Sequence, residues 1–350
     1  MENQNQTPHK RRVRYKGKYP KKFEEKYKEL QPEKYKDTIE HVIQKGNTPA
    51  GMHISIMVKE ILDFLNIQPG ETGFDATLGY GGHTKAMLQC LNGKGHIYAT
   101  DVDPEESAKT KKRLAEQGFG EELLTVKLQN FCTIDEIAKE VGGFDFILAD
   151  LGVSSMQIDN PKRGFSFKTD GPLDLRLNQE TGISAAQRLD TISREELAGM
   201  LCENSDEPYC EELAKAITDE IRRGNHIDTT TKLRQVIEKT LDFLPEKEKK
   251  ETIKKTCQRT FQALSIDVNH EFEVLYEFME KLPDALRPGG RVAILTFHSG
   301  EDKLVKKALK QGYKEGIYSD YSKDVIRPSA QECAQNGRAR STKMRWAIKA

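Results

Sequence analysis

The residues of this sequence best suited to chemistry are a glycine-rich loop and a carboxylate that follows it. Gly79, Gly81 and Gly82 lie in the loop, between a short apolar run and a segment that suits a helix. Asp101 ends the next apolar run. Glycines in a strand-to-helix turn let the backbone approach a ligand closely, because no Cβ intervenes. An acid after the following strand accepts hydrogen bonds from ribose hydroxyls, so the pair predicts a nucleoside site.

The spacing of the glycines narrows the choice of ligand. It does not match G-x-G-x-x-G, which favours a dinucleotide, or G-x-x-x-x-G-K-[ST], which cradles phosphates. A nucleoside without a phosphate chain, such as S-adenosyl-L-methionine, fits better. The alternative is that these glycines only form a tight turn, and the later motifs weaken this alternative.

The elements around the loop alternate between strands and helices from residue 70 to residue 150. The fourth apolar run, 144–149, leads directly into Asp150. Such alternation predicts an α/β fold with a mostly parallel sheet and helices on both faces. Ligands bind at the carboxyl ends of strands in these sheets. We therefore expect the glycine loop, Asp101, Phe131 and Asp150 to meet in one crevice.

Residues 172–255 carry helical patterns without convincing strands, which predicts an inserted helical domain. Its helices are expected at 194–202, 211–223 and 230–241. Alternation then resumes with a helix over 272–286, a turn over 287–290, a strand over 291–297, a helix over 301–310 and a last strand over 343–348. The expected parts are a basic, flexible arm (1–50), a first α/β part (51–171), the insertion (172–255) and a second α/β part (256–350).

Charge and cysteine content bound the class of protein. Formal net charge is zero, but residues 1–50 hold 13 Lys and Arg against 7 Asp and Glu. This basic arm indicates a polyanionic partner, with a solvated tail as the alternative. The six cysteines form no C-x-x-C pair, which argues against a zinc site and a disulfide framework. Without a signal peptide or a long apolar run, we expect a soluble, cytoplasmic protein with no membrane partner.

Several polar residues outside the loop are further candidates for chemistry. Asp150 could bind the charged end of a cofactor or accept a hydrogen bond from a substrate amine, or it could cap the next helix. His298 precedes Glu301 and Asp302, but no second His lies at ligand spacing, so the sequence predicts no metal site. The remaining candidates, which could clamp a flipped base or contact phosphate, are Arg163, Phe165, Arg176, Arg259, Arg338 and Arg340.

These segments, in this order, resemble the RsmH (MraW) family of bacterial S-adenosylmethionine-dependent methyltransferases, which modify the exocyclic N4 of a cytidine in 16S ribosomal RNA. The matching pieces are His53, 75–83 (DATLGYGGH), 101–104 (DVDP), 150–155 (DLGVSS), 163–167 (RGFSF), 170–176 (DGPLDLR), 259–263 (RTFQA), 297–299 (FHS) with Glu301 and Asp302, and 336–341 (NGRARS). The likeness covers about residues 52–350.

The resemblance implies a Rossmann-like methyltransferase fold with an inserted helical domain, and S-adenosyl-L-methionine as cofactor. Carried over motif by motif, the cofactor contacts are Gly81, Gly82, His83, Asp101, Phe131, Asp150 and Gln157, with Asp150 also the catalytic candidate. The substrate contacts are Arg163, Phe165, Asp174, Arg176, Arg259, His298, Arg338 and Arg340. The implied partner is 16S rRNA in the small ribosomal subunit. The sequence leaves the oligomeric state open, with a homodimer as one alternative.

Some positions depart from the family's usual pattern. Ser205-Asp206-Glu207 stands in place of Gly-Glu-Glu, Ser265 in place of Arg, Gly300 in place of Leu, and Ile54-Ser55 in place of a Thr-Thr or Thr-Pro pair. We therefore interpret the chain as a divergent paralogue. The alternatives are methylation of another nucleotide or substrate, and a non-catalytic RNA-binding assembly factor.

Overall fold

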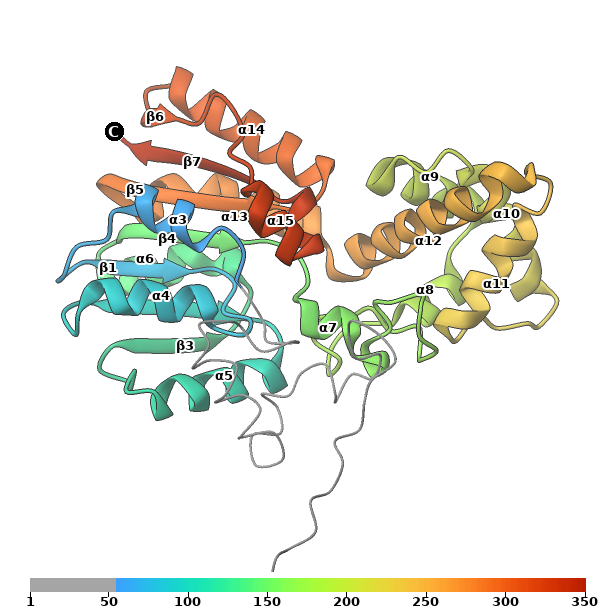
Figure 1. Ribbon diagram of the computed structural model, residues 1–350, viewed down its shortest axis with the longest axis horizontal. Coiled ribbons are helices and arrows are strands. Elements are labelled where there is room, and N and C mark those ends of the chain that lie inside the picture. Colours follow the sequence, from blue (N-terminus) through green and yellow to red (C-terminus); the bar gives the residue numbers. More distant parts are fainter. Residues whose placement is uncertain (1–54) are drawn as a thin grey trace, which may run out of the picture. The chain divides into compact units, whose positions relative to one another are not determined.

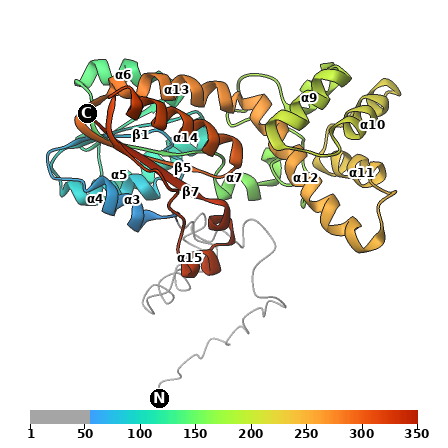
Figure 2. The same cartoon turned by 90° about the horizontal axis from the view of Figure 1, so that it is seen from above.

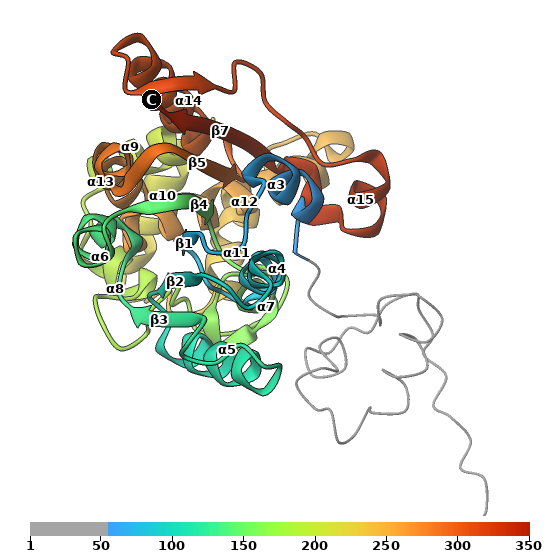
Figure 3. The ribbon, with the colours of Figure 1, turned by 90° about the vertical axis from the view of Figure 1, so that its left-hand side faces the viewer.

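The computed structural model describes residues 55–350, so the expected basic arm, His53 and Ile54 lie outside the described residues. Its centre is a seven-stranded sheet with the strand order β3-β2-β1-β4-β5-β7-β6, seen end-on in Figure 3. The first five strands of this order run parallel, and β7 is antiparallel to both β5 and β6. The strands are β1 (Thr72–Asp75), β2 (His96–Asp101), β3 (Leu124–Leu128), β4 (Phe144–Asp150), β5 (Leu286–Thr296), β6 (Tyr318–Tyr321) and β7 (Lys343–Lys349).

Helices cover both faces of this sheet, as Figures 1 and 3 show. One apolar core packs α6, α13 and α14 on the sheet, and a second packs α3, α4 and α5 on the opposite face. The helices around the sheet are α3 (Val58–Leu65), α4 (Gly82–Leu91), α5 (Pro104–Glu116), α6 (Ile134–Val141), α7 (Ser155–Asp159), α13 (Glu271–Ala285), α14 (Ser299–Lys314) and α15 (Ala330–Gln335).

Strand β4 shows why the sequence folds into a sheet covered on both faces. Its side chains at Ile147 and Ala149 enter one core, and those at Phe146 and Leu148 enter the other. A central parallel strand is buried on both sides, and so reads as a continuous apolar run. Asp150, which ends this run, therefore lies at the carboxyl edge of the sheet.

The segment that the sequence predicts to be an insertion contains α8 (Ala185–Thr191), α9 (Arg194–Ser205), α10 (Cys210–Arg222), α11 (Thr230–Thr240) and the long α12 (Glu246–Asn269). These helices share an apolar core of their own, and Figure 2 shows α12 beside α9 and α11. The three helices expected from the sequence are confirmed. The expected end of the insertion, residue 255, falls inside α12, which continues unbroken to Asn269.

Two features differ from the sequence prediction. The turn expected at 287–290 is wrong, because these residues belong to β5, whose pairing with β4 shifts register between Phe144 and Phe146. Strand β6, at the sheet edge, was not expected from its short and polar sequence, Tyr318–Tyr321. Across residues 55–350, no helix is both long and apolar enough to cross a membrane.

Candidate active site

The ends of β1, β2 and β4 bring three carboxylates to one edge of the sheet. Asp75, Asp101 and Asp150 each end their strand. Strand β1 pairs in parallel with both β2 and β4, so the three ends are neighbours. Asp101 and Asp150 therefore lie at one edge as expected, with Asp75 fully buried between them in strand order, and a shared ligand crevice stays a prediction.

The glycine loop is held by contacts on both of its sides. Gly79 and Gly81 have positive φ angles of 47° and 78°. A Cβ on Gly81 would lie 2.7 Å from Cγ2 of Thr110 in α5, and a Cβ on Gly82 would lie 2.0 Å from Oγ of Ser55. These glycines therefore form a tight turn, and their contact with a ligand stays a prediction. The backbone of the loop also lies next to the end of β2, where Gly79 contacts Asp101.

Asp101 is fixed by the backbone of the loop. Its Oδ2 accepts the N–H of Gly79 at 2.8 Å, and its Oδ1 accepts the N–H of Asp103 at 2.9 Å. Burial raises the pKa of Asp101 to about 6, although these two backbone hydrogen bonds act in the opposite direction. A carboxylate has about four lone-pair sites, so each oxygen can still accept a ribose hydroxyl.

His83 and Asp150 form a buried pair next to this loop. Nε2 of His83 lies 2.8 Å from the carbonyl oxygen of Ile56, and Nδ1 lies 3.3 Å from Oδ2 of Asp150. Both neighbours are acceptors, so the imidazole satisfies them only when both nitrogens carry protons. Burial lowers the pKa of His83, but Asp150, together with the Ile56 carbonyl and the charge of Asp75, raises it to about 8.

The second oxygen of Asp150 has no partner. Oδ1 is buried and makes no hydrogen bond, while the backbone N–H of Asp150 donates to Oγ1 of Thr77 at 2.8 Å. A buried acceptor without a donor is costly unless a ligand supplies one. The free oxygen fits a ligand that carries N–H donors or a positive charge, as S-adenosyl-L-methionine does.

The comparisons with known proteins decide the family. The MraW methylase family matches residues 50–350. The chain belongs to this family. It is a methyltransferase with a Rossmann-like fold, and its methyl donor is S-adenosyl-L-methionine.

Relatives of this methylase are found at high identity over nearly the whole chain. Ribosomal RNA small subunit methyltransferase H 1 of Agathobacter rectalis is 86% identical, covering 98% of both chains. The protein of the same name from Lachnoclostridium phytofermentans is 71% identical and covers 99% of this chain and 95% of its own length. Ribosomal RNA small subunit methyltransferase H of Acidobacterium capsulatum is 36% identical and covers 85% of this chain and 98% of its own length.

Asp103 is a residue of this methylase that the sequence analysis did not single out. Its Oδ1 caps α5 by accepting the N–H groups of Glu105 and Glu106. Its Oδ2 accepts hydrogen bonds from Arg163 at 2.6 Å and Gln157 at 3.1 Å. Asp103 thus ties the cofactor strand to the loop after β4. The Asp-Pro pair, common at helix starts, was the available signal.

The expected cofactor contacts Phe131 and Gln157 lie at this edge and also make internal contacts. The ring of Phe131 packs edge-on against Phe278, with centroids 5.2 Å apart. Gln157 completes a capping box with Ser154 at the start of α7. Contact of either residue with the cofactor stays a prediction.

The expected substrate residues Arg163, Asp174 and Arg176 form a network inside one loop. The side chain of Arg163 is 7% exposed and also donates to the carbonyl oxygen of Leu177 at 2.6 Å. Arg176 binds Asp174 through two nitrogens, each 2.8 Å from a carboxylate oxygen. These contacts fix the loop conformation, and contact of its residues with RNA stays a prediction.

The other expected substrate residues lie on separate elements. Phe165 packs against the core of the insertion, and Arg259 on α12 is partly exposed, 3.9 Å from Glu207. Arg338 binds Asp159 at the end of α7 at 2.8 Å, whereas Arg340 is exposed. His298 is the N-cap of α14 and forms a capping box with Glu301. Phe165 thus lies in the loop of Arg163 itself, whereas the other four residues lie on other elements.

Proposed function

We propose that this methylase transfers a methyl group from S-adenosyl-L-methionine to the exocyclic N4 of a cytidine in 16S rRNA of the small ribosomal subunit. The observation that carries the proposal is Asp150, whose Oδ1 is buried without a partner while Oδ2 faces His83. The names of the relatives at 86% and 71% identity support ribosomal RNA as the substrate class. The motif resemblance supports the cytidine N4 atom.

The donor side of the reaction belongs to the glycine loop and Asp101. The bound cofactor supplies an electrophilic methyl group. Asp101 accepts hydrogen bonds from the ribose hydroxyls, and the N–H of Gly79 keeps its carboxylate in place. The glycines leave room for the methionine part. These contacts fix the direction of the methyl group before the acceptor arrives, and such orientation supplies much of the rate enhancement.

The acceptor side belongs to Asp150. A cytosine amine is a poor nucleophile, because its lone pair is delocalised into the ring. Oδ1 of Asp150 accepts one N–H of the amine and so stabilises positive charge as it builds on nitrogen. The carbon–nitrogen bond forms as the carbon–sulfur bond breaks, and the amine proton leaves towards Asp150. Protonated His83 holds Oδ2 and keeps the carboxylate oriented.

The RNA would reach this edge with the target base unpaired or flipped out. The arginines Arg176, Arg259 and Arg340 and the basic arm (1–50) are the groups that we assign to the RNA backbone. We also propose the division into arm, α/β part, helical insertion and second α/β part.

Removing residues 1–50 should weaken RNA binding and flatten its salt dependence. An unchanged salt slope would show that the arm does not touch phosphate.

A second candidate is a paralogue that methylates another nucleotide or substrate. Two departures from the family pattern, Ser265 and Gly300, support it, because both lie against the start of α13 at Glu271 and Phe272. Ser265 donates a hydrogen bond to Glu271 at 2.7 Å, and a Cβ on Gly300 would lie 2.6 Å from the ring of Phe272. A non-catalytic assembly factor is less well supported, because the donor side of the site is intact.

The test is methyl transfer from radiolabelled S-adenosyl-L-methionine to small ribosomal subunits from a strain without this protein, followed by nucleoside mass analysis. Label in N4-methylcytidine supports the proposal, and label in another nucleoside supports the paralogue. Asp150→Asn should bind RNA but lose most turnover, whereas the exposed Asp320→Asn is the matched control. Full cofactor affinity and full turnover in Asp150→Asn would remove both roles from Asp150.

A further inference from the structure

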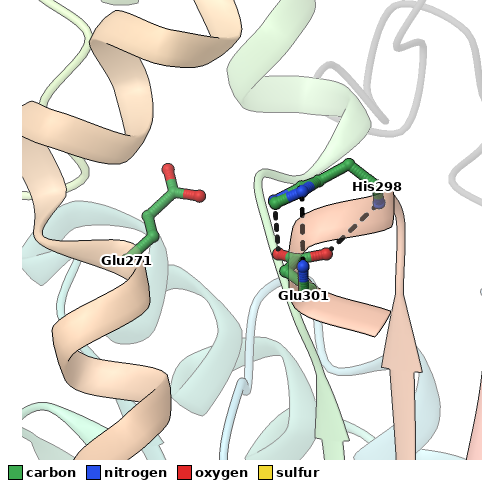
Figure 4. A group of neighbouring side chains, drawn as sticks. All are labelled: Glu271, His298 and Glu301. Carbon is green, nitrogen blue, oxygen red and sulfur yellow. Dashed lines mark hydrogen bonds and ion pairs between the residues drawn. The ribbon is translucent and has the colours of Figure 1, made fainter. Parts of the chain in front are cut away.

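Three side chains come together at the starts of two helices, next to the end of β5, which pairs in parallel with β4. Glu271 begins α13, His298 directly precedes α14, and Glu301 lies in the first turn of α14. One ligating atom from each residue lies within 4.8 Å of the other two (Figure 4). Glu271 approaches from the opposite side of the group to His298 and Glu301, so the three side chains converge from two elements.

Each member of this group is held by a neighbouring residue. Oε1 of Glu271 accepts the hydroxyl of Ser265 at 2.7 Å, and Oε2 of Glu301 accepts the backbone N–H of Phe297 at 2.8 Å. The ring of His298 meets that of Phe272 edge-on, with centroids 5.7 Å apart. Such outer contacts orient ligating side chains in protein metal sites.

Among residues 55–350, the only ion pair that the carboxylates of this group make is with His298. Within residues 55–350, neither Glu271 nor Glu301 forms an ion pair with Lys or Arg, and Glu301 is only 3% exposed. Nε2 of His298 is buried and makes no hydrogen bond, although Oε1 of Glu301 lies 3.3 Å away.

We propose that Glu271, His298 and Glu301 bind a divalent transition-metal ion of the Zn²⁺ class. Imidazole and carboxylate are both ordinary Zn²⁺ ligands, with bonds of about 2.0–2.2 Å, and three protein ligands leave one position for water. The present spacing requires the side chains to close around the ion. Mg²⁺ prefers oxygen ligands, so the imidazole selects against it.

The surroundings allow an ion to enter. Glu271 and His298 are both partly exposed. Phe272, the residue after Glu271, also lines a cavity of about 380 Å³ with Glu196, Glu203 and Glu273. Acidic linings raise the local concentration of cations. The sequence concealed the site, because Glu271 lies far from His298 along the chain.

The experiment is Zn²⁺ titration of the full chain, stripped with a chelator, followed by calorimetry, with Mg²⁺ as the comparison ion. We expect one Zn²⁺ bound per chain and much weaker Mg²⁺ binding. Glu271→Gln and His298→Gln should each weaken Zn²⁺ binding more than about 10-fold, since even outer contacts change metal affinity about 10- to 100-fold. Glu280→Gln, on the same helix but exposed and outside both the group and the cavity, is the matched control and should bind as the wild type does.

A second readout guards against misfolded variants and adventitious binding. Co²⁺ in place of Zn²⁺ should give visible absorption bands that shift in His298→Gln, and thermal unfolding of each variant checks its fold. The proposal is overturned by a wild type that takes up no Zn²⁺. It is equally overturned if folded Glu271→Gln and His298→Gln bind Zn²⁺ as tightly as the wild type, because the ion would then sit elsewhere.

Discussion

Replacing His83 with Gln should remove a pH-dependent part of the stability of this methylase. The pKa of His83 is about 8 in the folded protein, against an ordinary value near 6.5. The raised pKa means that the folded state binds the proton more tightly than the unfolded state. Each pKa unit corresponds to about 1.4 kcal/mol, so the pair with Asp150 stabilises the fold by about 2 kcal/mol below pH 6.5. This contribution is lost as the pH rises through 8.

The assay is urea unfolding of the wild type and His83→Gln at several pH values from 6 to 9. The difference between their free energies of unfolding should shrink by about 2 kcal/mol across this range. His226→Gln, which removes an exposed imidazole from the insertion, is the matched control for loss of a histidine. A difference that stays constant from pH 6 to 9 would refute the view that His83 is a buried imidazolium.

Three further substitutions test other parts of the site. Asp101→Asn should weaken cofactor binding about 10- to 150-fold by calorimetry, because hydrogen bonds to a charged acceptor contribute about 1.5–3 kcal/mol; unchanged affinity would exclude ribose binding by Asp101. Arg163→Met leaves the buried carboxylate of Asp103 without its ion-pair partner and should lower the free energy of unfolding in urea by about 3–5 kcal/mol. Lys59→Ala breaks an exposed ion pair and should lower it by at most about 1 kcal/mol. Equal losses in the two variants would contradict this ranking. Gly81→Ala should lower the urea midpoint of unfolding more than Gly93→Ala does. Both glycines have positive φ angles, but only a Cβ at residue 81 would meet a neighbouring side chain. Equal midpoints would show that the glycine loop can shift to make room for the Cβ.

The central part of the fold could be predicted because local patterns and the final packing agree there. Strand β4 is apolar throughout, since both of its faces are buried, and the helix at Pro104 begins with its own cap. The strand ends then place Asp101 and Asp150 at one edge without any further information. The edge strand β6 could not be predicted in this way, because it is short and half exposed. It is a strand because it pairs with β7, which the local sequence does not reveal.

The side-chain partners at the site depend on contacts between distant residues, which spacing along the chain does not reveal. Asp103 and Arg163 are 60 positions apart, and only the folded chain shows that they form a buried pair. Likewise, the sequence places His83 next to the glycine loop but does not show its ion pair with Asp150. That pair forms because β1 lies beside β4 in the folded chain. Residue types at strand ends were therefore predictable, whereas their charge partners were not.

The shared carboxylate of Asp103 has a consequence for protein engineering. One of its oxygens organises the helix that follows the donor-binding strand, and the other anchors the loop around Arg163. Substitutions that redesign this loop for another acceptor will shift Arg163 and thereby disturb donor affinity, so their effects will not add independently. A library that aims at new acceptors should hold Asp103 and Arg163 constant and vary the exposed positions of the loop.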